Sequence, residues 1–145
     1  MEHEFSRTEL LVGKRALDRL TRCKVAVFGI GGVGGYAAES LARCGVGQLV
    51  LVDNDLICLT NINRQLHATH SALGQPKVEV MKRRVLDINP RALVETHQTF
   101  YPDECEEQLI SPDLNYIIDA IDSVKSKIDL VVNACRLNIP IISSM

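Results

Sequence analysis

The stretch FGIGGVGG, residues 28–35, decides the fold of this chain. Its glycines fit the pattern G-x-G-x-x-G, with Gly29, Gly31 and Gly34 in register. The run KVAVFGI at 24–30 enters these glycines as a short β-branched segment, which is typical of a buried parallel strand. A strand that leads into such a turn and then into a helix brings backbone N–H groups and a helix N-terminus to a phosphate. The stretch therefore predicts a nucleotide-binding α/β fold.

The rest of the chain alternates between strand and helix patterns. Small and apolar residues follow the glycines at helical spacing, and Gly45 is expected to end that helix in the C-cap position. Further strands are expected at 48–53, 92–97, 115–121 and 139–143, and further helices at 8–20, 77–88, 103–110 and 128–135. This order predicts a Rossmann-like, doubly wound α/β fold, with a mainly parallel sheet and helices on both faces.

Length and composition agree with one globular domain. The chain has 145 residues, of which 46% are hydrophobic and 23% are charged. No apolar run reaches the roughly 20 residues of a membrane-spanning helix, and the polar N-terminus lacks a secretory pattern. We therefore expect a cytoplasmic protein without membrane contact. The net charge of −2 does not mark a nucleic-acid-binding protein by itself.

The five cysteines are scattered, and none is spaced as C-x-x-C. This excludes a disulfide framework and a zinc knuckle from the expected architectures. We expect most of them to be small buried residues rather than catalytic thiols, because free cysteine is among the most buried residue types.

The glycines and one acidic residue together predict a dinucleotide or nucleotide site. Gly29 permits the tight turn, Gly31 lets a phosphate approach the backbone, and Gly34 allows close packing of helix on strand. Asp53 ends the second expected strand, about 20 residues after the last glycine, where an acid usually binds a ribose hydroxyl. A glycine-rich turn without a ligand is the less favoured interpretation.

The residues that follow the second strand indicate which nucleotide is bound. This region carries acids, amides and two cations: Asp53, Asp55, Asn61, Arg64, Gln65 and Lys77. Two cations suit a triphosphate whose leaving pyrophosphate gains charge in the transition state, more than the pyrophosphate of a dehydrogenase cofactor. Asp119 and Asp122 end the fourth strand, where a carboxylate can bind Mg²⁺ together with phosphates. Each residue alone could be a surface charge or a turn cap, but together they favour an ATP site.

The motif series GxGGxG, LVDxD, NxxRQ, GxPKVE and DAxD resembles the ThiF/MoeB/HesA family of ubiquitin-activating-enzyme-like adenylating proteins, from about Phe5 to the end of the chain. Four stretches look most like the tRNA threonylcarbamoyladenosine dehydratase branch: FSRTELLVG at 5–13, GVGGYAAESLARCGVG at 32–47, CLTNINRQLHA at 58–68 and IPIISSM at 139–145. The lack of C-x-x-C pairs, which are common in relatives that activate sulfur carriers, agrees with this branch.

The resemblance implies a ligase-type enzyme that uses ATP and Mg²⁺ to adenylate a carboxylate. In the dehydratases the carboxylate belongs to a threonylcarbamoyl group on a tRNA adenosine, and the group closes into a ring as AMP leaves. The family is typically homodimeric, and its N-terminal arginine, here Arg7, reaches the ATP site of the partner protomer. Ser123 departs from the family pattern, in which many relatives have Asn after the metal-binding Asp.

The resemblance also assigns roles to residues. It implies that Gly31 and Gly32 approach the phosphates and that Asp53 binds ribose. Asn61, Arg64 and Lys77 would hold the phosphates, and Asp122 would hold Mg²⁺. The candidate catalytic residues are Arg7, Arg64, Lys77 and Asp122. The candidate nucleotide-binding residues are Gly29, Gly31, Gly32, Gly34, Asp53, Asp55, Asn61, Arg64, Gln65, Lys77 and Asp122.

Three other functions stay open at this point. A sulfur-carrier adenylyltransferase would share the chemistry and would act on a carrier protein ending in Gly-Gly, with a sulfur donor as a possible partner. An NAD-dependent oxidoreductase is supported by the glycine loop and Asp53 alone. A non-catalytic half of a heterodimer is disfavoured by the joint presence of Arg64, Lys77 and Asp122. We expect residues 1–145 to be an ATP-binding adenylation domain that forms the N-terminal part of a longer protein, because the last strand should lead into a further loop at the crevice.

Overall fold

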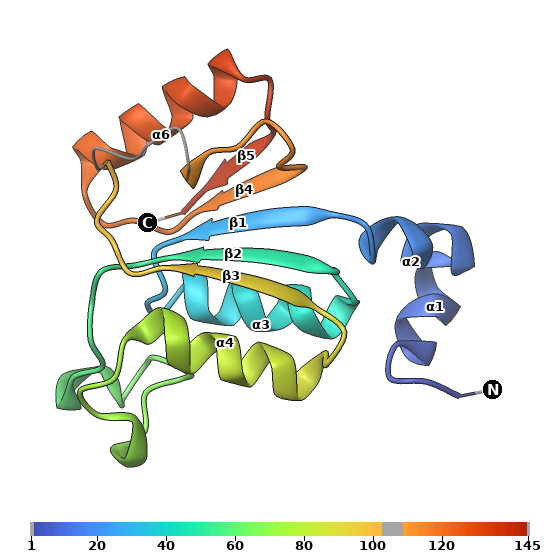
Figure 1. Cartoon of the computed structure of the whole chain (residues 1–145), viewed down its shortest axis with the longest axis horizontal. Helices are drawn as coiled ribbons and strands as arrows, with labels where there is room; N and C mark the ends of the chain where they lie inside the picture. Colours follow the sequence, from blue (N-terminus) through green and yellow to red (C-terminus); the bar gives the residue numbers. More distant parts are fainter. Residues whose placement is uncertain (1, 103–108, 145) are drawn as a thin grey trace.

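The computed structural model describes residues 2–102 and 109–144. Within these residues a five-stranded parallel sheet has the order β3-β2-β1-β4-β5 (Figure 1). The strands are β1 (Lys24–Phe28), β2 (Gln48–Val52), β3 (Leu93–His97), β4 (Tyr116–Asp119) and β5 (Ile141–Ser143). The predicted doubly wound α/β fold is confirmed.

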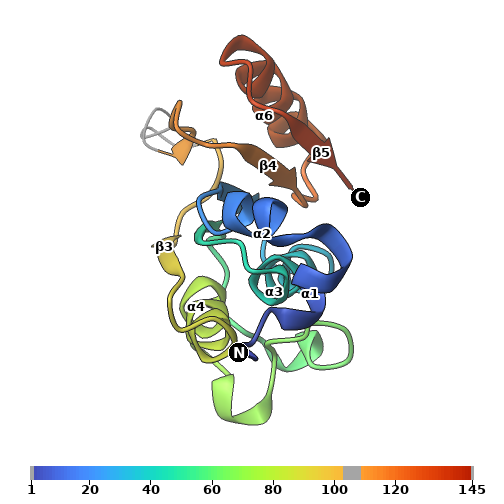
Figure 2. The same ribbon diagram turned by 90° about the vertical axis from the view of Figure 1, so that its right-hand side faces the viewer.

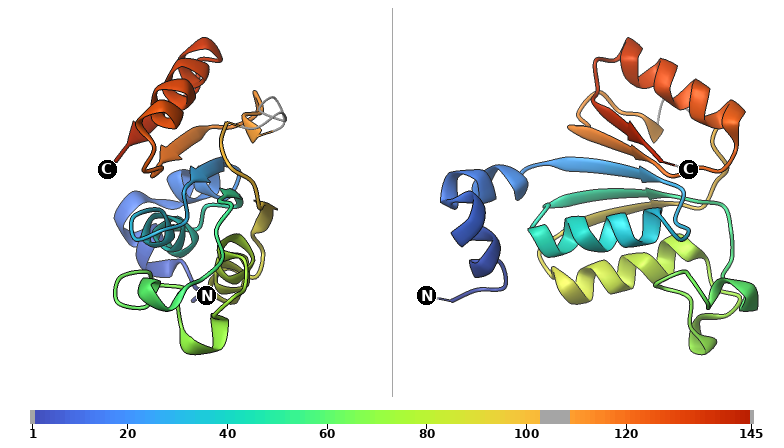
Figure 3. Two further views of the ribbon diagram at one scale, coloured as in Figure 1. Left: turned by 90° about the vertical axis from the view of Figure 1, so that its left-hand side faces the viewer. Right: turned by 180° about the vertical axis from the view of Figure 1, so that it is seen from behind.

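Helices cover both faces of the sheet, as predicted. Helices α3 (Gly34–Cys44) and α4 (Lys77–Ile88) lie on one face, and α6 (Val124–Arg136) lies on the other (Figures 1 and 3). Two short 3₁₀ turns, η1 (Leu59–Asn61) and η2 (His70–Ala72), lie in the connection between β2 and α4. Strands β1 and β2 are buried from their second residue onward, because apolar side chains from both layers pack on them.

Helix boundaries follow the sequence signals closely in the centre of the chain. Helix α4 has the predicted bounds, and α3 ends at Gly45, which has a left-handed φ of 88°. Helix α6 differs from the expected pattern. Its buried positions include Leu130 and Ala134, whereas Ile128 and Val132 are 61% and 59% exposed. The apolar periodicity therefore located the helix but not the face that packs on the sheet.

The N-terminal region was predicted wrongly as one helix over 8–20. It forms two helices, α1 (Ser6–Val12) and α2 (Lys14–Leu20), seen in front of the sheet in Figure 2. Gly13 separates them with φ of 81°, a conformation that a continuous right-handed helix cannot contain. Leu17 is buried as expected, but Leu11 is 87% exposed.

The prediction of buried cysteines was also wrong. Cys44, Cys58 and Cys135 are exposed, and Cys23 is half-buried. Most of the helix expected at 103–110, with Cys105, lies outside the described residues. In the described part of the chain, no helix has the length and apolar character needed to cross a bilayer.

Candidate functional site

A crevice of about 510 Å³ lies at the carboxyl end of the sheet. Residues that follow each of the five strands line it: 29–33 in part, 53–55, 99–101, 120–123 and Ser144. Arg64, Gln65 and Lys77 reach it from the connection between β2 and β3. Strand β1 has β2 on one side and β4 on the other, so the chain reverses its winding direction here. Such switch points are where ligands bind in open α/β sheets.

The glycine loop has the geometry that its sequence predicts. Gly29 adopts φ of 88°, and a Cβ on it would lie 2.5 Å from the carbonyl oxygen of Ala120. A Cβ on Gly34 would lie 1.7 Å from the carbonyl oxygen of Gly29, so only glycine allows this contact between helix and strand. Gly31 is different, because the nearest atom to its Cβ would be 3.7 Å away. Gly31 and Gly32 line the crevice and leave room for a ligand against the backbone.

The N-terminus of α3 opens beside the same loop. Its N-cap residue is Val33, and the Val33 side chain makes no capping hydrogen bond to the first turn. Uncapped N–H groups and the positive end of the helix dipole favour an anion at this place. The loop and the helix together can therefore hold phosphate groups.

Asp53 lies in the crevice and is hydrogen-bonded to the backbone of the glycine loop. Its Oδ2 accepts a hydrogen bond from the backbone N–H of Ile30 (2.6 Å), and its Oδ1 accepts one from Asp55 N–H (2.8 Å). A carboxylate has about four acceptor positions, so two remain for the hydroxyl groups of a ribose. The predicted ribose contact stays a prediction that this geometry permits.

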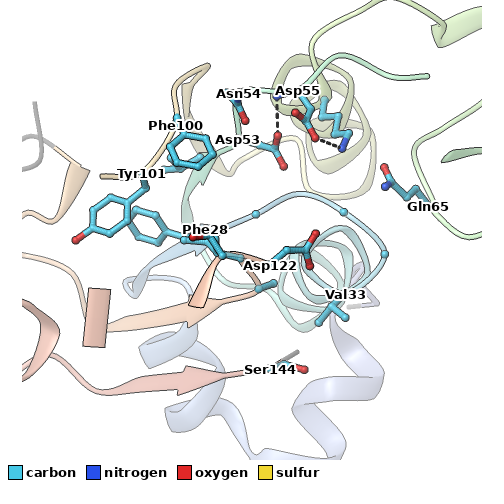
Figure 4. Close-up of a pocket in the computed structure, with 18 of the residues that line it drawn as sticks. Phe28, Val33, Asp53, Asn54, Asp55, Gln65, Phe100, Tyr101, Asp122 and Ser144 are labelled. Atoms are coloured by element: carbon cyan, nitrogen blue, oxygen red, sulfur yellow. Dashed lines mark hydrogen bonds and ion pairs between the residues drawn. The ribbon is translucent and has the colours of Figure 1, made fainter. Parts of the chain in front are cut away.

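Lys77 is buried at the first residue of α4, and its ammonium group faces the crevice. Its Nζ lies 2.8 Å from Oδ2 of Asp55, whose side chain is 58% exposed (Figure 4). The backbone N–H of Lys77 also donates to the carbonyl oxygen of Asp55 (3.0 Å). Because water screens the exposed Asp55 carboxylate, it neutralises the Lys77 charge only in part. The ammonium group can therefore also attract an anionic ligand in the crevice.

Arg64 and Gln65 face the crevice from the NxxRQ motif. The Arg64 guanidinium donates to the carbonyl oxygen of Thr60 (2.7 Å) and to Oδ1 of Asn63 (3.1 Å). Within the described residues no carboxylate pairs with it, so its charge is uncompensated. Gln65 is buried, and its Oε1 has no hydrogen-bond partner among these residues. Both side chains are therefore available to a polar ligand.

Asp122 lies in the turn after β4, exposed and facing the crevice (Figure 4). Over residues 2–102 and 109–144, no three His, Cys, Asp or Glu side chains form a cluster that could hold a metal by themselves. Mg²⁺ commonly binds through one or two carboxylates together with substrate phosphates. A single carboxylate beside a phosphate-binding loop fits that mode.

Three predicted site residues lie outside the crevice lining: Gly34, Asn61 and Arg7. Asn61 is buried in η1, where its Oδ1 accepts a hydrogen bond from Cys58 N–H (2.9 Å). This contact shapes the loop that carries Arg64. A contact between Asn61 and phosphate stays a prediction. Arg7 is exposed on α1, at the opposite end of the sheet from the crevice of its own chain (Figure 1).

Sequence reasoning missed the apolar wall of the crevice. Phe28 and Val52 are buried there, and Phe100 is 55% exposed at the rim. Tyr101 packs edge-on against Phe28 with ring centroids 5.2 Å apart (Figure 4). Such a wall suits a purine ring. No motif surrounds Thr99–Tyr101, so their position after β3 was the one available signal.

His67 lies behind the crevice, between the NxxRQ loop and α3. It is 3% exposed, and neither ring nitrogen has a hydrogen-bond partner among the described residues. A Cβ on Gly35 would lie 3.0 Å from its Nδ1, so the ring packs against the first turn of α3. Burial, together with the positive charges of Lys77 and Arg84, lowers the pKa of His67 to about 4.

The chain belongs to the ThiF family, whose model matches residues 5–145. It is 51% identical over 145 residues to the tRNA threonylcarbamoyladenosine dehydratase of Bacillus subtilis (strain 168), which covers 100% of this chain and 57% of that protein. The molybdopterin-synthase adenylyltransferase of Haemophilus influenzae is 32% identical over 126 residues, covering 87% of this chain and 51% of that protein.

Solved structures agree with this assignment. The crystal structure of the Escherichia coli tRNA N6-threonylcarbamoyladenosine dehydratase TcdA in complex with ATP matches with a TM-score of 0.93 and 41% identity. The match covers 97% of this chain and 58% of that chain. This chain thus spans a little over half the length of these relatives.

Proposed function

We propose that the protein binds ATP in this crevice and adenylates a carboxylate, and that its substrate is threonylcarbamoyladenosine in tRNA. The observation that carries the proposal is the convergence of the Arg64 and Lys77 cations and the Asp122 carboxylate on the phosphate-binding glycine loop. The dehydratase names of the most similar relatives support the choice of substrate. An NAD-dependent oxidoreductase would leave these three side chains without a role.

In the proposed reaction an oxygen of the substrate carboxylate attacks the α-phosphorus of ATP. The bond from that phosphorus to the pyrophosphate oxygen breaks, and an acyl-adenylate forms. Arg64 and Lys77 would stabilise the negative charge that grows on the pyrophosphate and on the reacting centre. AMP then leaves as the threonylcarbamoyl group closes into a ring.

Asp122 would hold a Mg²⁺ ion, which when bound neutralises charge on the phosphates. The protein's own contribution is to place that carboxylate on the turn after β4, next to the glycine loop. Asp53 would bind the ribose, and the apolar wall with Phe100 would cover the adenine. No side chain needs to act as a covalent nucleophile.

We also propose that the protein is a homodimer. Helix α1, which carries Arg7, lies at the opposite end of the sheet from the crevice of its own chain, so a role of Arg7 in the site requires a second copy. Leu10 and Leu11 on the same helix are 79% and 87% exposed, which suits a helix that packs against another chain. A cytoplasmic location and a tRNA partner follow from the proposed substrate.

The second candidate function is adenylation of a sulfur-carrier protein, supported by the 32% identity to a molybdopterin-synthase adenylyltransferase. The two functions differ in the molecule that stimulates ATP consumption. Threonylcarbamoylated tRNA should release AMP and pyrophosphate from ATP in the first case. A carrier protein ending in Gly-Gly should do so in the second.

The test is the exchange of labelled pyrophosphate into ATP, with the tRNA substrate present. Lys77→Ala is expected to lose at least 100-fold in exchange rate while its circular dichroism stays that of the wild type. Lys82→Ala, on the same helix but outside the crevice lining, is the matched control and should keep full activity. Full exchange activity in the Lys77 variant would overturn the assignment of this crevice.

A further inference from the structure

Lys127 of α6 lies inside the molecule, with 8% of its surface exposed. Its Nζ lies 3.1 Å from Oδ2 of Asp119, a carboxylate without exposed surface at the end of β4. The same ammonium group donates to Oγ of Ser143 (3.3 Å) and to the carbonyl oxygen of Ser144 (2.5 Å). One buried cation therefore joins α6 to the ends of β4 and β5.

Asp119 also makes hydrogen bonds to residues that line the crevice. Its Oδ1 accepts a hydrogen bond from the backbone N–H of Ile121 (3.1 Å), and its Oδ2 accepts one from Ser143 Oγ (2.5 Å). Its carbonyl oxygen accepts a hydrogen bond from Ser144 N–H (2.9 Å). Ile121 and Ser144 line the crevice, whereas Lys127 and Asp119 do not. The ion pair therefore lies outside the crevice and is hydrogen-bonded to the backbone that forms its wall.

The turn that Asp119 holds is in contact with the glycine loop. A Cβ on Gly29 would lie 2.5 Å from the carbonyl oxygen of Ala120, and one on Gly34 would lie 3.4 Å from the Cβ of Ala120. Asp122 follows directly in the same turn. A small movement of this turn would displace the Asp122 carboxylate and also remove a close contact of the glycine loop.

Stability alone does not explain a buried ion pair at this position. Taking two charges out of water is unfavourable, and an apolar pair of similar volume is often as stabilising. Directional hydrogen bonds to two backbone segments are what the charged pair adds, and apolar side chains cannot make them. The contacts made by Lys127 and Asp119 are of this kind.

We propose that Lys127 is a positioning residue for the nucleotide site. Through Asp119 and Ser144 it holds the turn after β4 and the backbone after β5, and so keeps Asp122 and Ser144 in the lining of the crevice (Figure 4). This inference rests on the proposed binding of ATP. It adds a residue outside the crevice to the set that determines ATP affinity.

The experiment compares ATP affinity with stability in the purified protein. The double variant Asp119→Asn/Lys127→Met removes both charges together, so that no unpaired charge stays buried. Its thermal unfolding midpoint is expected to stay within a few degrees of the wild type, while the Kd for ATP with Mg²⁺ rises at least tenfold. Lys125→Met, an exposed lysine two residues away on α6, is the control and should bind ATP as the wild type does.

Ser143→Ala provides a second variant at an exposed position, which tolerates the loss of one hydroxyl without unfolding. It is expected to weaken ATP binding about threefold, because β5 loses its side-chain link to the ion pair. Lys127→Arg, which keeps the charge, should recover most of the affinity lost in Lys127→Met. A folded double variant that binds ATP within twofold of the wild type overturns the inference.

Two further results are possible: the double variant does not fold, or the wild type binds no ATP. If the double variant does not fold, unchanged ATP affinity in Ser143→Ala overturns the inference and weaker binding supports it. If the wild type itself binds no ATP, the proposed function fails first and the inference falls with it.

Discussion

Replacing His67 with leucine is expected to flatten the pH dependence of stability between pH 7 and pH 5. The buried imidazole has a pKa lowered from 6.5 to about 4, and its two nitrogens have no partners among the described residues. Between these pKa values the unfolded chain binds more protons than the folded chain. Protonation therefore favours unfolding, and the stability that the neutral ring permits is lost as the pH falls through this window.

The size of this loss in unfolding free energy follows from the lowered pKa of His67. With one pKa unit worth about 1.4 kcal/mol, His67 should account for a loss of about 2 kcal/mol in unfolding free energy from pH 7 to pH 5. His67 is 3% exposed, so solvent screens the effect little. The pKa of Glu39 is lowered from 4.5, chiefly by its hydrogen bond from Arg84. The stability that this carboxylate contributes is therefore lost only as the pH falls below about 4.5, which lies outside the range from pH 7 to pH 5.

The assay is urea denaturation of the wild type and His67→Leu at pH 7 and pH 5, with the exposed His70→Asn as the matched control. The wild type and His70→Asn should lose about 2 kcal/mol more than His67→Leu over this range. Equal losses in the wild type and His67→Leu would refute a buried neutral imidazole at this position.

Three other substitutions test particular contacts. Gly34→Ala should prevent folding, as judged by circular dichroism, because its Cβ would lie 1.7 Å from a backbone carbonyl oxygen. Gly31→Ala has its nearest neighbour at 3.7 Å, so it should fold normally but bind ATP at least tenfold more weakly in calorimetry, since the methyl group takes the phosphate's place. Tyr101→Phe should lower the free energy of unfolding by about 1–2 kcal/mol, measured in urea, because Tyr101 Oη donates to Asp129 and accepts from Asn133. A folded Gly34 variant, unchanged ATP affinity in the Gly31 variant, or unchanged stability in the Tyr101 variant would contradict the corresponding contact.

The fold could be predicted from sequence wherever periodicity and end signals agreed. The strand–glycine–helix unit at 24–45 and the helix over 77–88 have these signals, and both formed as expected. The prediction failed at Gly13, because a glycine within a helical pattern does not show whether it adopts positive φ. It also failed for the cysteines, since residue type alone does not show which face of an element packs on the sheet.

The site was predictable where strand ends carry charged residues. Asp53 follows β2 and Asp122 lies in the turn after β4, and both reach one crevice because the carboxyl ends of parallel strands meet at one edge of the sheet. Lys77 reaches the same crevice from the first residue of α4. The hydrogen bonds that hold the backbone around these residues could not be predicted from the sequence. Asn61 holds a backbone N–H of its own loop, and Lys127 bonds Asp119 from another helix. These contacts depend on how distant elements pack, which local motifs do not encode.

The most direct test of the account is a calorimetric titration of the purified protein with ATP and Mg²⁺, and separately with NADH. The account predicts that ATP binds, that Lys77→Ala weakens this binding at least tenfold, and that NADH binds more weakly than ATP. NADH binding tighter than ATP, or ATP binding that is unchanged in the Lys77 variant, would contradict the claim that this crevice is an ATP site for adenylation.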